Sequence, residues 1–159
     1  MVCCVDKSIP GWLDARNFAT VLAAAPLIAI DLLVENDCGE YLLGLRKNAP
    51  AQDWWFVPGG RVLKGEALDE AFRRLTYIEL GREYERHKED LRGVYEHFYE
   101  NSIAGEHIST HYIVLAYRVK LAEQYPIALD SRQHKNMLWV KPQDMRALNV
   151  HHYTLAYFE

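Results

Sequence analysis

The sequence predicts an α/β domain, and three stretches of the chain favour this class. Residues 54–81 form a strand, loop and helix unit, residues 27–46 form an apolar hairpin, and residues 93–99 and 110–120 alternate or stay apolar as strands do. With 159 residues, of which 50% are hydrophobic, the chain is long enough for one domain with a substantial core. We expect no second domain.

The chain begins with an extension, residues 1–26, that ends in a short amphipathic helix. Trp12 and Phe18 stand at roughly helical intervals with the apolar residues that follow, and Pro26 ends the segment. The aromatic side chains of this helix either cover one edge of the domain or contact a second subunit. The sequence alone favours the first arrangement.

Two apolar runs, residues 27–34 and 41–46, indicate a β-hairpin around a turn at 36–39. Asp31 is a lone carboxylate in the first run, so it either faces an open side of the sheet or is held by a ligand. Arg46 closes the second run, and a charge at the end of a strand is usually a solvated edge charge.

Residues 57–81 are the central unit of the chain. The strand that ends at Val57 stops at Pro58-Gly59-Gly60, and a helix of about fourteen residues follows and ends at Gly81. Its apolar residues recur at i, i+3 and i+4 spacing and define one buried stripe, which consists of Leu68, Ala71, Phe72, Leu75 and Ile78.

Glu79 is the exception in this helix. It lies within about 20° of Leu68 around the helix axis, in the middle of the apolar stripe. An ionised carboxylate on a buried face needs a cation or a metal ion to offset its desolvation. Glu79 therefore either has such a partner or turns to solvent in a frayed last turn.

The second half of the chain begins with a charged connector, residues 82–90, that we expect to be solvated. His97, His107 and His111 lie in or near the two strands that follow, where a histidine is either hydrogen-bonded scaffold or part of a site. A polar loop at 129–136 precedes a strand at 137–140, and a short helix is expected at 142–148. The loop contains Gln133 and His134, which on their own would be surface residues.

Composition excludes several classes of partner. A net charge of −4 and a pI near 6.0 argue against nucleic acid or a membrane surface, because both favour a basic face. The three cysteines, Cys3, Cys4 and Cys38, have no metal-binding spacing and are too few for a disulfide framework, which favours a reducing cytoplasm. We expect no signal peptide and no membrane span.

The spacing of Gly60, Glu66, Arg74, Glu79 and Gly81 resembles the Nudix box, G-x5-E-x7-R-E-U-x-E-E-x-G-U. The chain departs from this box at three places, with Leu75 and Ile78 where the box has glutamates and Arg82 where it has an apolar residue. The GDP-mannose mannosyl hydrolase branch has the same truncated box, and the resemblance covers nearly the whole chain. It implies a Nudix fold, an α/β/α sandwich with a central mixed sheet and the box helix at the metal site.

The resemblance also implies a role for several residues. Two carboxylates of the box are missing, so one Mg²⁺ per subunit, or Mn²⁺, is expected on the Gly59 carbonyl, Glu79 and Gln133. His134 matches the general base, and Arg46 matches an arginine near the leaving diphosphate. The residues expected to bind substrate are Asp31, Arg46, Arg61, Arg74, His97 and Tyr112.

Some of these residues suit their roles by their chemistry alone. A guanidinium fork fits planar pairs of phosphate oxygens, which favours Arg61 and Arg74 as phosphate ligands. The alternative for Arg74 is an ion pair with Glu70, one helical turn away. The unperturbed pKa of histidine, about 6.5, suits His134 as a base.

We therefore expect hydrolysis of GDP-mannose to GDP and mannose, with water attacking the anomeric carbon and inverting it. GDP-glucose is another candidate substrate, and the resemblance implies a homodimer. Two alternatives stay open. One is a Nudix diphosphatase that cuts the P–O–P bond of a nucleotide sugar or another nucleoside diphosphate derivative, and the other is a module that binds a nucleotide sugar without turnover.

Overall fold

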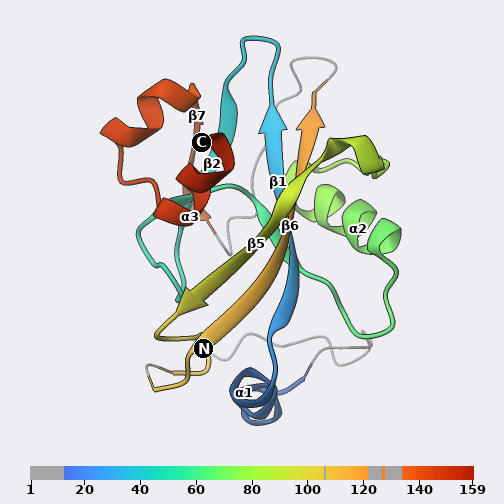
Figure 1. Ribbon diagram of the computed structural model, residues 1–159, viewed down its shortest axis with the longest axis vertical. Helices are drawn as coiled ribbons and strands as arrows, with labels where there is room; N and C mark the ends of the chain where they lie inside the picture. Colours follow the sequence, from blue (N-terminus) through green and yellow to red (C-terminus); the bar gives the residue numbers. More distant parts are fainter. Residues whose placement is uncertain (1–12, 106, 122–126, 128–133) are drawn as a thin grey trace.

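A seven-stranded mixed sheet forms the centre of the structure, a computed structural model that describes residues 13–105, 107–121, 127 and 134–159 (Figure 1). The helices are α1 (Ala15–Ala24), α2 (Leu68–Leu80) and α3 (His152–Leu155), with short 3-10 helices η1 (Lys88–Asp90), η2 (Pro142–Ala147) and η3 (Ala156–Phe158). The strands are β1 (Leu27–Glu35), β2 (Tyr41–Arg46), β3 (Trp55–Phe56), β4 (Gly59–Arg61), β5 (Leu91–Tyr99), β6 (Thr110–Lys120) and β7 (His134–Val140).

Strand β1 is the centre of the sheet. It pairs in parallel with β6 along its whole length, from Leu27 opposite Tyr112 to Glu35 opposite Lys120. On its other side it pairs with β4 and then with β2, and Glu35 lies opposite Tyr41 in the pairing with β2. The predicted hairpin is therefore present at its turn only. The strands diverge beyond the turn because β4, which we expected to be a break at Pro58-Gly59-Gly60, fills the place beside β1.

Helix α2 covers one face of the sheet, on the right in Figure 1. Its buried residues include Ala71, Phe72 and Leu75, as the periodicity predicts. Ile78 was expected in the stripe but is 37% exposed, because the face that meets the sheet passes through Thr76, Glu79 and Leu80 instead. The buried members of this core are Ile30, Leu32, Val34, Leu42, Ala71, Phe72, Leu75, Leu80, Tyr117, Val119, Leu121 and Ile127.

The C-terminal segment covers the opposite face. η2, α3 and η3 lie against the sheet on the left in Figure 1, so the chain forms the expected three layers. The buried members of this second core are Leu33, Leu43, Val57, Ala116, Val140, Met145, Val150 and Tyr157. Alternate residues of β1 thus point into the two cores, and Asp31 shares the side of Leu33.

Two peripheral segments differ in how well the sequence predicts them. Helix α1 forms within the expected range, and the side chain of Asp14 caps it by accepting a hydrogen bond from the Asn17 backbone at 3.0 Å. The connector 82–90 is mostly exposed, as expected, but one of its side chains is anchored. Arg86 donates to Asp69 at 2.6 Å and to the Tyr117 hydroxyl at 2.9 Å, which fastens the connector to α2 and β6.

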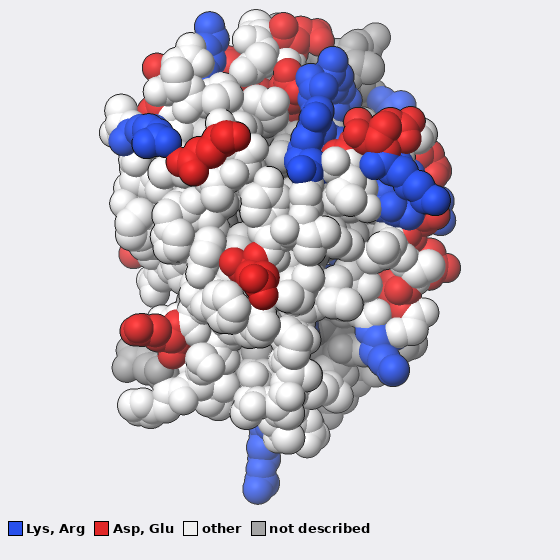
Figure 2. Space-filling model, in the orientation of Figure 1, with Lys and Arg blue, Asp and Glu red and all other residues white. Residues whose placement is uncertain are grey.

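Charged side chains on the face shown in Figure 2 gather mainly near its upper end and its right side, with acids and bases interspersed. Much of the lower centre is uncharged. This face therefore has no continuous basic stripe. Within the described ranges, no helix has the length and apolar character needed to cross a membrane.

Candidate active site

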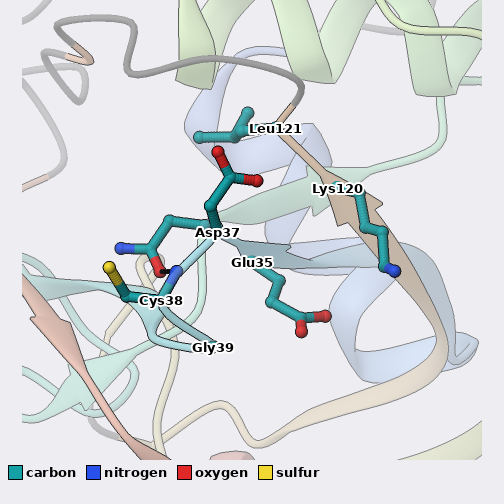
Figure 3. Close-up of a pocket in the computed structure, with 7 residues that line it drawn as sticks. Glu35, Asp37, Cys38, Gly39, Lys120 and Leu121 are labelled. Atoms are coloured by element: carbon teal, nitrogen blue, oxygen red, sulfur yellow. Dashed lines mark hydrogen bonds between the residues drawn. The ribbon is translucent and has the colours of Figure 1, made fainter.

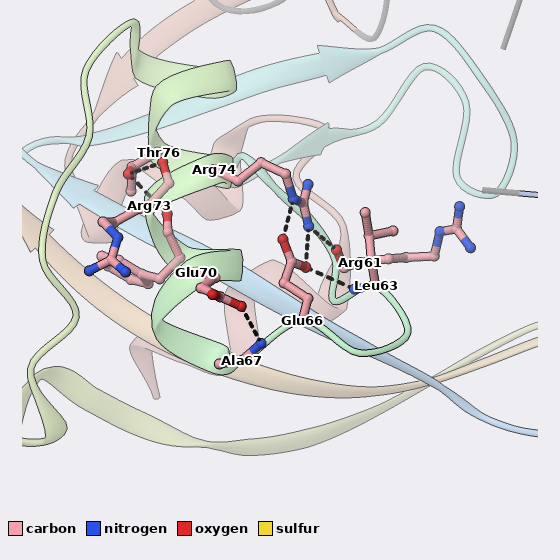
Figure 4. Close-up of polar contacts among 9 residues, drawn as sticks. Arg61, Leu63, Glu66, Ala67, Glu70, Arg73, Arg74 and Thr76 are labelled. Atoms are coloured by element: carbon pink, nitrogen blue, oxygen red, sulfur yellow. Dashed lines mark hydrogen bonds and ion pairs between the residues drawn. The ribbon is translucent and has the colours of Figure 1, made fainter. Parts of the chain in front are cut away.

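The loop before α2 is held in shape by a half-buried fork of hydrogen bonds (Figure 4). Arg74 donates through Nε and Nη2 to the two carboxylate oxygens of Glu66, at 2.6 and 2.8 Å, and Nη2 also donates to the Arg61 carbonyl at 2.8 Å. Glu66 in turn accepts from the Leu63 backbone at 2.9 Å. Arg74 therefore pairs with Glu66. The alternative partner, Glu70, accepts from the Ala67 backbone at the start of the helix instead.

The last turn of α2 is fastened, so Glu79 does not fray out to solvent. Gly81 takes the left-handed conformation with φ of 75°, and its N–H donates to the Tyr77 carbonyl. Thr76 accepts a hydrogen bond from the Tyr84 backbone at 3.0 Å, which holds the chain that leaves the helix. The prediction that Glu79 lies on the buried stripe is confirmed, because its side chain is 1% exposed.

Glu79 faces His134, and both side chains are buried. Oε2 of Glu79 lies 3.3 Å from Nε2 of His134. Within the described residues neither this oxygen nor Nδ1 of His134 has a hydrogen-bond partner. His134 is the first residue of β7, not part of a surface loop as the sequence predicts. Residues 128–133 lie outside the described residues, Gln133 among them.

Two features of the sheet bring His134 to Glu79. Between the pairs Gly44–Met137 and Arg46–His134, β7 has one more residue than β2, and this bulge turns His134 to the face that Met137 shares with α2. Gly44 then leaves room for the ring, since a side-chain carbon at this position would lie 2.2 Å from Nδ1 of His134. Strand β2 thus has a glycine at its centre because the imidazole packs directly on its backbone.

The Glu79–His134 pair fits a divalent metal ion by its chemistry. A carboxylate oxygen that is buried without a hydrogen bond is a costly group unless a cation joins it. Among the described residues no three His, Cys, Asp or Glu side chains are grouped closely enough to hold an ion. Further ligands would therefore have to be backbone carbonyls, residues outside the described ranges or oxygens of the substrate, which favours one ion.

Asp31 lies on the opposite side of the sheet, beside the box loop. It pairs with Gly59 in the register of β1 and β4, and a side-chain carbon on Gly59 would lie 2.8 Å from Oδ1 of Asp31. The Tyr157 hydroxyl donates to Oδ2 at 2.6 Å. Burial raises the pKa of Asp31 from 3.8 to about 6, and the Tyr157 hydrogen bond and the charge of Arg46 oppose this rise. Asp31 is thus held by the C-terminal segment and is only partly exposed.

His97 belongs to the same group. Its Nε2 lies 3.1 Å from the Tyr157 hydroxyl, and its ring stacks on Tyr153 with centroids 4.1 Å apart. Burial lowers its pKa from 6.5 to about 4, with smaller contributions from His151 and His152. The ring is therefore neutral at neutral pH.

Two arginines and a tyrosine lie close to this group. Tyr112 is opposite His97 in the pairing of β5 and β6, and burial raises its pKa while Arg61 and Arg46 lower it. The guanidinium of Arg61 lies over the Phe18 ring at 4.2 Å, and that of Arg46 lies 5.3 Å from the centre of the Phe56 ring. Arg46 is also opposite His134 in the sheet, so it connects the two halves of the site.

The structure therefore brings the predicted residues together in two neighbouring groups. One consists of Glu79 and His134, and the other consists of Asp31, Arg46, Arg61, His97 and Tyr112. Arg74 lies under the box loop, and its Nη1 atom takes no part in the bonds to Glu66 and Arg61. Sequence reasoning missed Tyr153, Tyr157 and Gly44, of which only Gly44 has a signal in the sequence, as a glycine inside a strand pattern.

A depression of about 340 Å³ lies elsewhere, at the turn between β1 and β2 (Figure 3). Its lining consists of Glu35, Asn36, Asp37, Cys38, Gly39, Lys120 and Leu121, none of which is a predicted site residue. It is at the end of β1 that follows Val34, whereas Asp31 and Gly59 meet in the middle of the strand. We therefore place no function there.

Known proteins resemble this chain over most of its length. Residues 25–158 match the NUDIX domain family. The low-salt glycan biosynthesis protein Agl8 of Haloferax volcanii is 33% identical over 143 residues, which cover 90% of this chain and 86% of Agl8. A MutT NUDIX hydrolase from Burkholderia pseudomallei is 26% identical with a TM-score of 0.68, covering 84% of this chain and 95% of that one.

A third likeness concerns the fold alone. The bifunctional NMN adenylyltransferase/ADP ribose pyrophosphatase from Francisella tularensis, in a complex with AMP and a Mn ion, has a TM-score of 0.56 at 19% identity. The match covers 91% of this chain and 46% of that protein. From the family match and the identity to Agl8 together, the chain belongs to the NUDIX domain family.

Proposed function

We propose that this Nudix hydrolase cleaves GDP-mannose to GDP and mannose by water attack at the anomeric carbon, with inversion. The observation that carries the proposal is the buried pair of Glu79 and His134, whose side chains lie 3.3 Å apart. His134 also lies opposite Arg46 in the pairing of β2 and β7. A metal-ligating carboxylate, a base and a phosphate-binding cation are the three groups that this reaction needs. The chain supplies all three within one small region.

Attack at carbon is favoured over attack on phosphorus by the carboxylates that the box lacks. Leu75 is buried in the core and Ile78 is partly exposed, at positions where other Nudix boxes carry glutamates. Glu79 alone remains of the terminal pair. A site with one carboxylate suits one metal ion on the diphosphate. A different group, His134, would then activate the attacking water.

The proposed metal ligands are Glu79, the Gly59 carbonyl and Gln133. Mg²⁺ or Mn²⁺ suits this oxygen set and, when bound, would neutralise charge on the leaving diphosphate. Arg46, with Arg61 and Tyr112 beside it, would bind the phosphate oxygens from the protein side. Nη1 of Arg74 is also available for such a contact.

His134 would take the proton of the attacking water. Its burial against Gly44 fixes the ring, and a fixed base needs no reorganisation when the water approaches. No carboxylic acid is needed on the leaving side, because a diphosphate whose charge is neutralised leaves without a proton. Asp31 and His97 would hold the mannose hydroxyls, with Asp31 beside Gly59 of the box loop.

The name of Agl8 adds independent support for a sugar substrate. That relative is described as a glycan biosynthesis protein, and glycan synthesis uses sugars that are activated as nucleotide or lipid phosphates. A nucleotide sugar therefore fits both the site and the relative. We further propose a homodimer, which light scattering after gel filtration would test.

Product analysis tests the proposal. A ³¹P and ¹H NMR time course of GDP-mannose with the protein and Mg²⁺ should show GDP and β-mannose as first products, and H134A and E79Q should lose this activity. GMP with mannose 1-phosphate would instead establish a P–O–P diphosphatase. Binding of GDP-mannose without any product would establish a binding module. GDP-glucose, run in parallel, measures the preference for the sugar.

A further inference from the structure

Tyr157 joins two residues of the site that come from different strands. It lies in η3, near the end of the chain, and its hydroxyl contacts Oδ2 of Asp31 at 2.6 Å and Nε2 of His97 at 3.1 Å. Its ring is 9% exposed and packs edge to face on Tyr95 at 4.7 Å. The hydroxyl is therefore held in place between a carboxylate and an imidazole.

The chemistry of these three groups sets the direction of both hydrogen bonds. A phenol has one proton to donate, and an ionised carboxylate can only accept. The Tyr157 hydroxyl therefore donates its hydrogen bond to Asp31, and the phenol oxygen accepts one from His97. His97 then carries its proton on Nε2, because its ring is neutral at neutral pH.

We propose that Tyr157 is a positioning residue that fixes the Asp31 carboxylate and holds His97 as its Nε2–H tautomer for sugar binding. This inference rests on the proposed function, which assigns both residues to the mannose. With Oδ2 and Nε2 occupied, Oδ1 of Asp31 and Nδ1 of His97 remain as acceptors, and two sugar hydroxyls can donate to them. Tyr157 thereby makes both residues acceptors that suit a diol.

The polarity of this chain of hydrogen bonds is testable without a substrate. In ¹H–¹⁵N long-range correlation spectra at pH 7.5, the His97 ring, identified by its absence in H97Q, should show protonated Nε2 and unprotonated Nδ1. Y157F keeps the ring and removes the hydroxyl, so it should give a mixture of tautomers. Y95F is the matched control, because the described residues form no hydrogen bond with the Tyr95 hydroxyl, and it should keep the wild-type signals. A protonated Nδ1 in the wild type, or an unchanged tautomer in Y157F, would overturn the proposal.

The role in sugar binding requires a second measurement by calorimetry with E79Q as the common background, so that turnover is suppressed. Y157F should weaken GDP-mannose binding about tenfold, as expected for loss of a hydrogen bond to a charged group, and leave GDP binding within about twofold. An equal loss for both ligands would mean a merely structural role and refute the positioning role. Because the spectra are recorded on the free protein, they test Tyr157 even if GDP-mannose proves not to be the substrate.

Discussion

The buried His97 predicts how the stability of the protein depends on pH. Its pKa is about 4 in the folded chain and 6.5 in an unfolded one, so unfolding takes up a proton below pH 6.5. The stability contributed by the neutral ring is fully present above pH 6.5 and is lost as the pH falls toward 4. Since one pKa unit corresponds to about 1.4 kcal/mol, the loss attributable to His97 is about 2 kcal/mol at pH 5.

The substitution H97Q isolates this contribution. Urea denaturation followed by tryptophan fluorescence at pH 7.5 and 5.0 gives the free energy of unfolding for each protein at each pH. The wild type should lose about 2 kcal/mol more than H97Q on acidification, whatever the variant costs at pH 7.5 through its lost stacking on Tyr153. H107Q, at an exposed histidine, should follow the wild type. If H97Q and the wild type lose the same free energy, His97 is not buried as a neutral ring.

Three further substitutions test the other parts of the site. G44A should displace the His134 ring, at a cost of about 1–3 kcal/mol in stability and most of the activity; wild-type activity in a purified G44A protein would contradict the packing of that ring. E66Q should cost about 2 kcal/mol in urea denaturation by weakening the bonds to Arg74, whereas E85Q, in an exposed pair with Arg73, should cost less than about 0.5 kcal/mol. Mn²⁺ should raise the melting temperature of the wild type and of E83Q, an exposed control, but not of E79Q; an equal rise in all three would place the ion elsewhere.

The sequence predicts the helices and strands of this fold better than it predicts which strands pair with one another. The periodicity of α2 locates Glu79 on the buried face, because a helix of 3.6 residues per turn determines which residues share a side. The pairing of β1 with β6 and β4 depends on contacts between distant residues, and local pattern carries no information about it. The predicted hairpin at 27–46 is present, but for this reason its two strands pair next to the turn, at Glu35 and Tyr41.

The site shows the same limit more sharply. His134 was assigned to a loop because the sequence does not reveal that a bulge in β7 lets the strand begin at this residue and turn it toward Glu79. No pattern in the sequence marks Tyr153 or Tyr157 as residues of the site. The hydroxyls of Tyr153 and Tyr157 form hydrogen bonds with the Phe98 carbonyl and Asp31, and these bonds exist only because the C-terminal segment folds onto the sheet face opposite α2.

Two glycines, one in β2 and one in β4, explain how polar groups can be buried on both faces of one sheet. Gly44 allows an imidazole to lie on β2, and Gly59 allows β4 to approach the backbone and carboxylate of Asp31, with a side-chain carbon falling 2.4 Å from the Ile30 carbonyl if one were present. A methyl group at either position would push a functional group out of place, so neither glycine is there for flexibility. A glycine inside an apolar strand pattern is therefore the one local signal in this sequence that marks where the sheet makes room for chemistry. In Y-L-L-G-L-R it stands two residues before Arg46 and directly beneath His134.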